Sequence, residues 1–170
     1  MNVAETDRLI LSKVTLRDAP FFLELMNSPM WIKYIGDRNI RTIEDAEAHL
    51  KNTILKCYAE YGFGFYKVLL KAENKKTIGI SGLVKRQQLD DVDIGFGFLP
   101  NYEGNGYGYE SSIAVLNLAK EQFGLSKITA ITLPTNINSI HLLEKLGLVY
   151  QKKVKPFEDD EELLLFVKNL

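Results

Sequence analysis

The spacing of hydrophobic residues near the start of the chain predicts a strand followed by a helix. The run over residues 8–14 is rich in Leu, Ile and Val and is typical of a strand. Thr15 and Asp18 follow in the pattern of a capping box, which predicts a helix that reaches about Asn27. We expect this helix to stop at Ser28-Pro29.

A second helix is predicted by the same start signal at Thr42 and Asp45. We expect it to run through about Tyr61 and to end at Gly62, because glycine commonly follows the last residue of a helix. Its apolar residues are spaced so that they form a single face, which comprises Ala46, Leu50, Ile54 and Tyr58.

Three runs rich in Val, Ile and Phe follow, and they predict an antiparallel meander. They cover residues 64–72, 77–87 and 91–99, with turn-like sequences at 73–76 and 89–90 between them. Turns this short cannot hold the crossovers that a parallel sheet requires, which argues against a Rossmann-like sheet. The chain is therefore expected to be an α+β protein with a mixed sheet.

Helices and strands alternate in the remainder of the chain. One helix is predicted from Gly108 to about Phe123 and another from near Ser139, and Gly124 and Gly147 close them. The remaining strands are expected at residues 128–133, 149–154 and 163–167, and the acidic run 158–162 is interpreted as a solvated hairpin tip.

Composition narrows the class of protein. With 170 residues, of which 46% are hydrophobic, the chain can build one core, and we expect a single domain over residues 1–170. A net charge of −1 argues against a generic nucleic-acid binder, so no nucleic-acid partner is expected. Cys57 is the only cysteine, which excludes an internal disulfide or a cysteine-rich zinc site. No signal-like or membrane-length apolar run is present, and we expect a soluble, cytoplasmic protein without a membrane partner.

The most informative stretch covers residues 98–110, where a strand-like run enters a loop with glycines at 104, 106 and 108 and then an amphipathic helix. Glycine permits backbone angles and close approaches that a Cβ obstructs, so successive N–H groups can converge on an anion at the helix N-terminus. A P-loop would need Lys-Ser/Thr where Tyr109-Glu110 stands, and a Rossmann fingerprint would need another glycine spacing. A surface turn without a ligand is the remaining alternative.

A second segment, residues 136–148, carries Asn136, then Ser139, then Glu-Lys-Leu-Gly ending at Gly147. In this order the loop and the second segment resemble the GNAT superfamily of acyl-CoA N-acyltransferases, in which the glycine-containing loop binds pyrophosphate. The chain is most similar to the branch that includes ribosomal-protein N-terminal acetyltransferases, and this similarity is carried by Asp93-Ile94-Gly95, Glu110 and the segments 5–11 and 79–83.

The resemblance implies a three-layer α/β/α fold with a mixed, mostly antiparallel sheet of six to seven strands and about four helices. It also implies that the fourth and fifth strands, residues 91–99 and 128–133, splay apart to admit the pantetheine arm of acetyl-CoA, with no metal. Backbone groups of Phe98 and Leu99 would face the pantetheine, and Asn136 would bind its amide or position the acceptor. The N–H groups expected to bind the pyrophosphate are those of Gly104, Asn105, Gly106, Tyr107, Gly108 and Tyr109.

Acyl transfer to an amine requires a neutral amine and a proton for the departing thiolate. At pH 7, neutralising the amine costs about 1.4 kcal/mol for an α-amine and about 4.6 kcal/mol for a lysine. Asp93 is the candidate general base, with an ordinary surface aspartate as the alternative, and Ser139 is the candidate acid, with a helix cap as the alternative.

Two positions depart from the superfamily pattern: Leu143 stands where many members have a tyrosine acid, and Glu103 where Gln or Arg is usual.

The acceptor pocket is expected to include Trp31 and Tyr34 from the connection 30–38, together with Phe65, although aromatic residues there serve packing equally well. His49 and His141 are interpreted as helix-surface residues. The sequence thus predicts an acetyl-CoA-dependent N-acetyltransferase, monomeric or homodimeric, whose favoured acceptor is a protein or peptide N-terminal α-amine. A small-amine or antibiotic acetyltransferase, a non-catalytic acyl-CoA sensor and a nucleotide-binding module are the alternatives.

Overall fold

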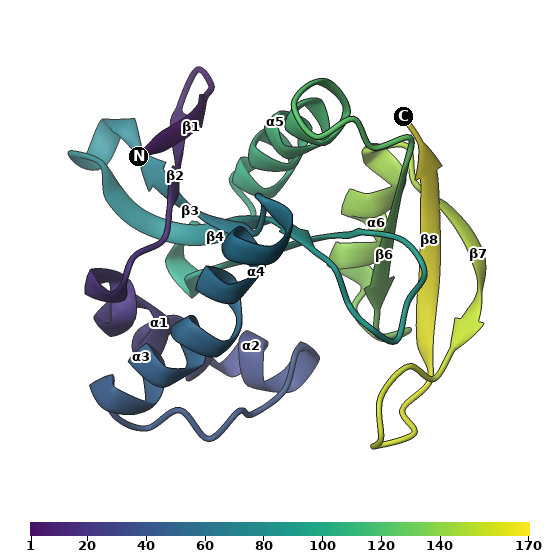
Figure 1. Cartoon of the computed structure of the whole chain (residues 1–170), viewed down its shortest axis with the longest axis horizontal. Helices are drawn as coiled ribbons and strands as arrows, with labels where there is room; N and C mark the ends of the chain where they lie inside the picture. Colours follow the sequence, from purple (N-terminus) through teal and green to yellow (C-terminus); the bar gives the residue numbers. More distant parts are fainter.

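The computed structural model describes residues 1–170 and is built around one mixed sheet (Figure 1). Its eight strands are β1 (Asn2–Glu5), β2 (Leu9–Lys13), β3 (Phe65–Leu70), β4 (Lys76–Val84), β5 (Asp93–Phe98), β6 (Lys127–Thr132), β7 (Val149–Val154) and β8 (Leu163–Asn169). Across the sheet they follow the order β1-β2-β3-β4-β5-β6-β8-β7. Every neighbouring pair is antiparallel except β5 and β6, which are parallel. The predicted mixed, mostly antiparallel sheet is confirmed.

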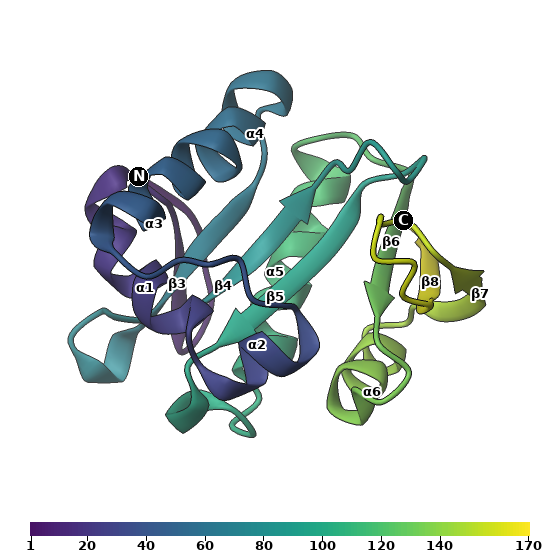
Figure 2. The same cartoon turned by 90° about the horizontal axis from the view of Figure 1, so that it is seen from below.

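Six α-helices cover the two faces of this sheet: α1 (Ala19–Met26), α2 (Pro29–Tyr34), α3 (Ile43–Asn52), α4 (Ile54–Tyr61), α5 (Tyr107–Glu121) and α6 (Ile137–Lys145). Helices α1 to α4 lie on one face, and α5 and α6 lie on the other (Figure 1, Figure 2). This arrangement confirms the three-layer α/β/α architecture.

The strand and helix counts are higher than the six to seven strands and about four helices that were predicted. The additional strand is β1, whose sequence Asn-Val-Ala-Glu is too short and too polar to be recognised alone and becomes a strand by pairing with β2. One additional helix is α2, which lies within the segment expected to be a connection. Pro29 stands in its first turn, where the missing N–H of proline has no intrahelical partner to lose.

The helix predicted over residues 42–61 is two helices, α3 and α4. Thr53 separates them with a non-helical backbone conformation, φ −122° and ψ −84°, and its hydroxyl donates a hydrogen bond to the carbonyl of His49. The predicted apolar face survives the break, because Ala46, Leu50 and Ile54 are all buried. Periodicity therefore identified the buried face and missed the interruption.

The predicted helix boundaries rest on capping interactions that are present in the structure. Reciprocal capping-box hydrogen bonds join Thr15 to Asp18 and Thr42 to Asp45, although the first box opens a 3-10 turn that leads into α1. Left-handed glycines follow three of the helices, and they are Gly62, Gly124 and Gly147 with φ of 80°, 64° and 91°.

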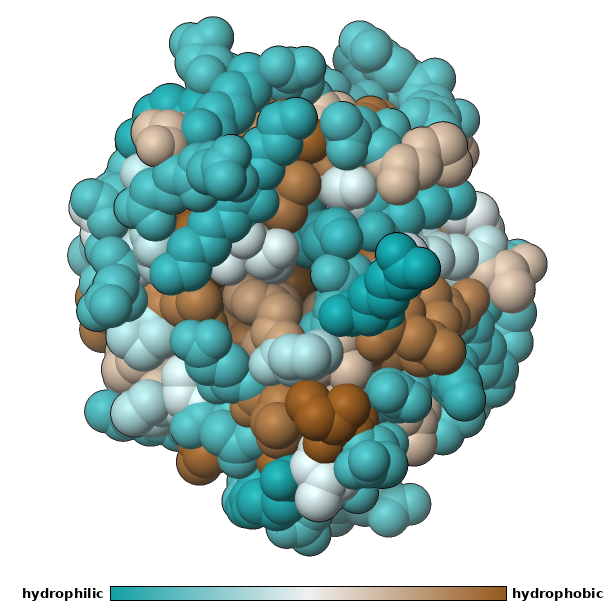
Figure 3. Space-filling model, turned by 90° about the vertical axis from the view of Figure 1, so that its left-hand side faces the viewer, coloured by the Kyte–Doolittle hydropathy of each residue, from teal (hydrophilic) through white to brown (hydrophobic).

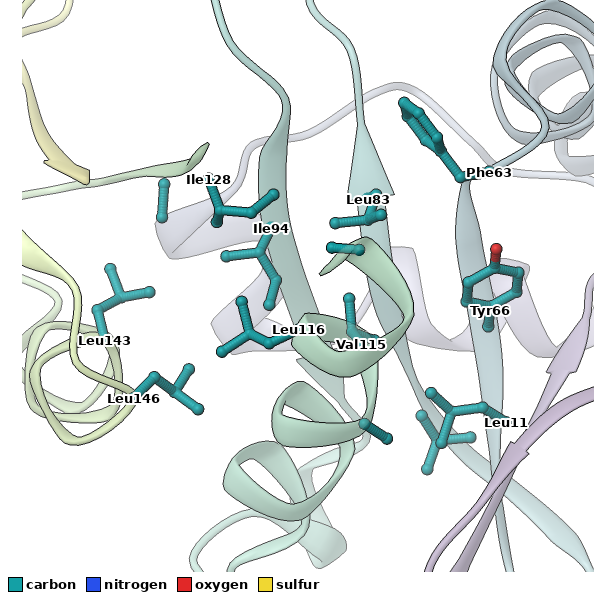
Figure 4. Close-up of a cluster of buried hydrophobic side chains, with 14 of the residues drawn as sticks. Leu11, Phe63, Tyr66, Leu83, Ile94, Val115, Leu116, Ile128, Leu143 and Leu146 are labelled. Carbon is teal, nitrogen blue, oxygen red and sulfur yellow. The ribbon is translucent and has the colours of Figure 1, made fainter. Parts of the chain in front are cut away.

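Two buried clusters of apolar side chains hold the layers together. In the larger cluster, Val115 and Leu116 of α5 pack against Leu83 and Ile94 of the sheet, with side chains of α6 at one side (Figure 4). The smaller cluster lies on the opposite face and joins α1, α3 and α4 to the sheet; Phe22, Leu25 and Leu50 are among its members. Each face of the sheet is therefore covered by its own helical layer.

A register shift between β3 and β4 lets β4 contribute to both clusters. Val68 pairs with Gly79 and Leu69 pairs with Thr77, which leaves Ile78 as an extra residue. Ile78 therefore packs in the larger cluster and Ile80, two residues on, packs in the smaller one.

The parallel strands β5 and β6 are paired at one position only, Asp93 with Thr129. Beyond that position the two strands diverge, and the separation is visible in Figure 2. The predicted splay of the fourth and fifth strands is present, since these are β5 and β6 once β1 is counted.

The side of the molecule that carries the N-terminal strands has hydrophilic residues around several groups of apolar side chains (Figure 3). Among the helices, none combines the length and hydrophobicity that a membrane span requires.

Candidate active site

A cleft of about 640 Å³ opens between β5 and β6. Side chains from α2 and α4 line one wall, and residues of β6 and α6 line the other, so that α2 and α6 flank the opening (Figure 2). Six of the predicted site residues line this cleft. They are the acceptor residues Trp31, Tyr34 and Phe65, the catalytic residues Asp93 and Ser139, and the predicted cofactor-binding residue Asn136. The loop over residues 104–109 does not line it.

Trp31 and Phe65 pack closely against the backbone of β5. A Cβ on Gly97 would lie 2.7 Å from the Trp31 ring, and a Cβ on Gly95 would lie 2.9 Å from the Phe65 ring. The two glycines thus make room for the aromatic rings that wall the cleft. Alternating glycines inside a strand are a signal of such a close approach, and this signal in Asp-Ile-Gly-Phe-Gly-Phe was not used in the sequence analysis.

A polar stripe from α3, α4 and the residue between them also lines the cleft. It comprises His49, Asn52, Thr53, Lys56 and Glu60. The interpretation of His49 as a helix-surface residue is therefore incomplete, because His49 is half-buried in the cleft wall. Burial, assisted by the nearby Arg38 guanidinium, lowers the pKa of His49.

Asp93 lies at the closed end of the cleft with 2% of its surface exposed. The Thr129 hydroxyl donates a hydrogen bond to one carboxylate oxygen, and Nε of Arg86 donates to the other at 2.9 Å. Burial raises the pKa of Asp93, and the hydrogen bonds and the positive charge of Arg86 oppose that shift. The carboxylate keeps free lone pairs, since each of its oxygens can accept two hydrogen bonds.

Asn136 and Ser139 stand at the first turn of α6. Oδ1 of Asn136 accepts a hydrogen bond from the backbone N–H of Ser139 at 3.3 Å, so Asn136 is the N-cap of this helix. Leu143, one helical turn further along, is 1% exposed and also lines the cleft. The cleft wall is therefore apolar at the position where many GNAT proteins have a tyrosine.

The glycine loop leads into the N-terminus of α5. Gly104 and Gly106 have positive φ, 77° and 82°, which side-chain-bearing residues rarely adopt. Gly108 serves a different purpose, because a Cβ there would lie 3.0 Å from Leu142 of α6. No side chain caps α5, whose N-cap is Gly106, so the first-turn N–H groups have no side-chain acceptor and suit an anion.

Leu99 and Phe98, whose backbone groups are predicted to face the pantetheine, differ in the backbone pairing that they already have in the structure. Leu99 donates its N–H to the carbonyl of Ile78 and accepts from the N–H of Tyr102, both at 2.9 Å, so only the second lone pair of its carbonyl is free. Phe98 ends β5 on the stretch that has no pairing with β6. Glu103 is exposed to solvent at the C-cap of the turn before the loop, and burial raises the pKa of its carboxyl group.

Arg8 anchors the glycine loop through its side chain. Its guanidinium donates to the carbonyl of Asn105 at 2.9 Å and to Glu110 Oε1 at 2.7 Å, and it lies 4.5 Å from the ring centre of Tyr107. Burial opposes ionisation of Glu110, but hydrogen bonds from Thr6 and Arg8 outweigh it and lower the pKa of this carboxyl group. Glu110 and the segment 5–11, which contains Arg8, both carry the family resemblance, but no motif in the sequence predicts that they pair.

The sequence model of the acetyltransferase (GNAT) domain matches residues 8–149 of the chain. The chain belongs to the GNAT acetyltransferase family. This GNAT protein is 30% identical to the uncharacterised N-acetyltransferase YoaA of Bacillus subtilis over 152 residues, which cover 89% of the chain and 84% of YoaA. It is an acetyl-CoA-dependent acetyltransferase.

Two solved structures of ribosomal-protein acetyltransferases share the fold of this GNAT protein. The ribosomal L7/L12 α-N-protein acetyltransferase RimL, in complex with coenzyme A, superposes with a TM-score of 0.82 and 13% identity, over 100% of this chain and 98% of RimL. The ribosomal-protein-S5-alanine acetyltransferase of Vibrio fischeri gives 0.75 and 18% identity, over 99% and 96% of the two chains. At these identities the likeness concerns the fold alone.

The site suits the acyl donor that acetyltransferases of this fold use. The uncapped first turn of α5 and the two left-handed glycines leave backbone N–H groups without side-chain acceptors, which fits the diphosphate of acetyl-CoA. Beyond Asp93 and Thr129, β5 and β6 have no further pairing. No group of three or more His, Cys, Asp or Glu side chains is arranged to hold a metal ion.

Proposed function

We propose that this acetyltransferase transfers the acetyl group of acetyl-CoA to the N-terminal α-amine of a protein or peptide. The observation that carries the proposal is the cleft between β5 and β6, where a polar helical stripe and the Trp31 and Phe65 rings surround space for a chain end. The fold shared with two ribosomal-protein acetyltransferases supports the same acceptor class. The α-amine is also about 3 kcal/mol easier to neutralise at pH 7 than a lysine side chain.

Acetyl-CoA, when bound, supplies a thioester carbonyl that a neutral amine can attack. In this proposal the N–H groups of Gly104 to Tyr109 hold the diphosphate, and Phe98, Leu99 and Asn136 orient the pantetheine arm. Ser139 holds a proton at Oγ for the departing sulfur, a role supported by its place on the cleft wall and by the apolar side chain at Leu143.

Asp93 is proposed as the group that takes the proton from the acceptor ammonium, directly or through a water. Its burial supports this role, because a raised pKa makes a carboxylate a better base near neutral pH. Arg86 and Thr129 oppose it by stabilising the charged form. The same two partners fix the orientation of the carboxylate at the end of the cleft.

The test measures thiol release from acetyl-CoA with peptides whose α-amine is free or blocked and that either contain or lack a lysine. Mass spectrometry then locates the acetyl group. We expect turnover only with a free α-amine and a product acetylated there. Acetylation confined to lysine, or turnover with small amines only, contradicts the proposed acceptor, and tight CoA binding without any turnover supports a non-catalytic acyl-CoA sensor instead.

A further inference from the structure

The cleft has an excess of positive charge although the chain as a whole has a net charge of −1. Four cationic and two anionic side chains line it, and they are Arg38, Lys56, Lys85 and Arg86 against Glu60 and Asp93. The local balance is therefore opposite in sign to that of the whole protein.

Both carboxylates in the cleft already have cationic partners. Asp93 pairs with Arg86 at 2.9 Å, and Glu60 lies 3.8 Å from Lys56. A positively charged part of an acceptor, other than the reacting ammonium that the proposed function assigns to Asp93, would thus find no carboxylate that is free of a protein partner.

Arg38 and Lys85 supply the excess charge. Neither forms an ion pair in the structure. Lys85 donates to the carbonyls of Arg86 and Leu89 at 2.9 and 2.6 Å, and although its charge helps to lower the pKa of Asp93, it has no carboxylate partner of its own. Asp37, the neighbour of Arg38, pairs instead with Arg41. Arg38 is exposed and close enough to His49 to influence its titration.

Trp31 contributes an aromatic ring to the same cleft. Its indole Nε1 is buried and has no hydrogen-bond acceptor in the protein. The charge that the cleft offers to an occupant therefore comes from Arg38 and Lys85.

The diphosphate of the acyl donor does not account for these cations. None of residues 104–109, which form its cradle, lines the cleft that contains Arg38 and Lys85. The excess charge therefore faces the acceptor side of the site.

We propose that the preferred acceptor carries a carboxylate side chain within one or two residues of the reacting amine, as in a peptide with an acidic residue near its N-terminus. This inference rests on the proposed function. Arg38 and Lys85 attract the carboxylate. The same cations favour loss of a proton from the bound ammonium, because nearby positive charge lowers the pKa of an amine.

The experiment uses three hexapeptides with a free α-amine that differ only at the second position, which is Glu, Gln or Lys. We expect kcat/KM to be about tenfold higher for the Glu peptide than for the Gln peptide and lowest for the Lys peptide. The advantage of the Glu peptide is expected to shrink between 50 and 300 mM salt, because salt screens partly exposed charges.

Variants identify the residues responsible. In Arg38→Gln, and in Lys85→Gln as an independent variant, the Glu-to-Gln ratio of kcat/KM is expected to fall at least threefold. Lys51→Gln is the matched control, because Lys51 is an exposed α3 residue that does not line the cleft, and it is expected to leave the ratio unchanged. Thermal unfolding of each variant checks that the fold is retained.

Two results separate this inference from the proposed function. Equal kcat/KM for the Glu and Gln peptides in the unaltered enzyme overturns the inference while leaving α-amine acetylation intact. If no peptide is acetylated, the proposed function fails, and amino acids compared with their amides then test the charge preference by itself. Equal turnover of each amino acid and its amide overturns the inference in that case.

Discussion

Asp93 and Thr129 face each other at the single paired position between β5 and β6, and the Thr129 hydroxyl donates a hydrogen bond to the Asp93 carboxylate. The backbone N–H of Thr129 also donates to the carbonyl of Val92 at 3.0 Å. These contacts fix the point from which the two strands diverge. Thr129 therefore both orients Asp93, the proposed base, and joins the two strands at the point where the cleft begins to open.

Asp93→Asn tests the base role with little change in shape. We expect kcat to fall about a hundredfold, the low end of the range for losing a general base. KM for acetyl-CoA is expected to change little, since the diphosphate cradle is elsewhere. Asp91→Asn is the control, because Asp91 forms a half-exposed ion pair with Lys127 and does not line the cleft; unchanged kcat in Asp93→Asn would exclude Asp93 as the base.

The same variant has a predicted effect on stability. Burial raises the pKa of Asp93, so the folded state binds this proton more tightly than the unfolded state does. The contribution of Asp93 to the free energy of unfolding therefore falls as pH rises from about 3.9, the ordinary value, to the raised folded-state pKa, and stays constant above it. Urea unfolding at a series of pH values should show this decline in the difference between wild type and Asp93→Asn. An opposite slope would mean that Arg86 and Thr129 outweigh burial.

Arg8→Ala is expected to raise KM for acetyl-CoA about tenfold with a small effect on kcat. The substitution removes the charge-assisted hydrogen bonds to Asn105 and Glu110 that hold the loop, and such a loss corresponds to about 1.4 kcal/mol. Lys153→Ala removes an exposed ion pair with Glu162 on the β7–β8 hairpin and serves as the control. Equal KM values for the two variants would show that the loop does not need Arg8.

Gly106→Val is expected to abolish CoA binding in a domain that still folds. A branched residue at a φ of 82° is strained, and the Cβ would lie 3.2 Å from the Arg8 guanidinium that holds the loop. Gly124→Val imposes similar backbone strain, at a φ of 64°, after α5 and away from the loop. Both variants should lose about 1–3 kcal/mol of stability. Calorimetry with CoA should find binding only in Gly124→Val, and retained binding in Gly106→Val would contradict the assigned cradle.

Ser139→Ala is expected to lower kcat about a hundredfold while KM for acetyl-CoA changes less than about twofold, because the proton donor acts only as the thiolate departs. The substitution keeps the backbone N–H that Asn136 accepts from, so the cap of α6 is preserved. Asn138→Ala is the control, because Asn138 is an exposed residue of the same turn that does not line the cleft. Normal turnover in Ser139→Ala removes Ser139 from the mechanism.

Features set by neighbouring residues were predicted from the sequence. The capping boxes at Thr15 and Thr42, the glycines that close helices and the buried face through Ala46 and Leu50 depend on residues within a few positions of each other. Local chemistry also marked the strand–glycine loop–helix segment as an anion cradle. Two local features were missed: β1 is too short and too polar to be recognised without its pairing to β2, and α3 ends at Thr53 without a warning in the periodicity.

The sequence by itself determined most of the elements, the family pattern and the candidates Asp93 and Ser139, because each of these lies in a motif readable along the chain. Trp31 and Phe65 were expected in the cleft from the architecture that the family resemblance implies. Only the tertiary structure decided the pairing of Arg8 with Glu110, the Arg86 partner of Asp93 and the charge balance of the acceptor side. Such relationships arise when segments far apart in sequence pack together, and burial and charge depend on that packing rather than on composition.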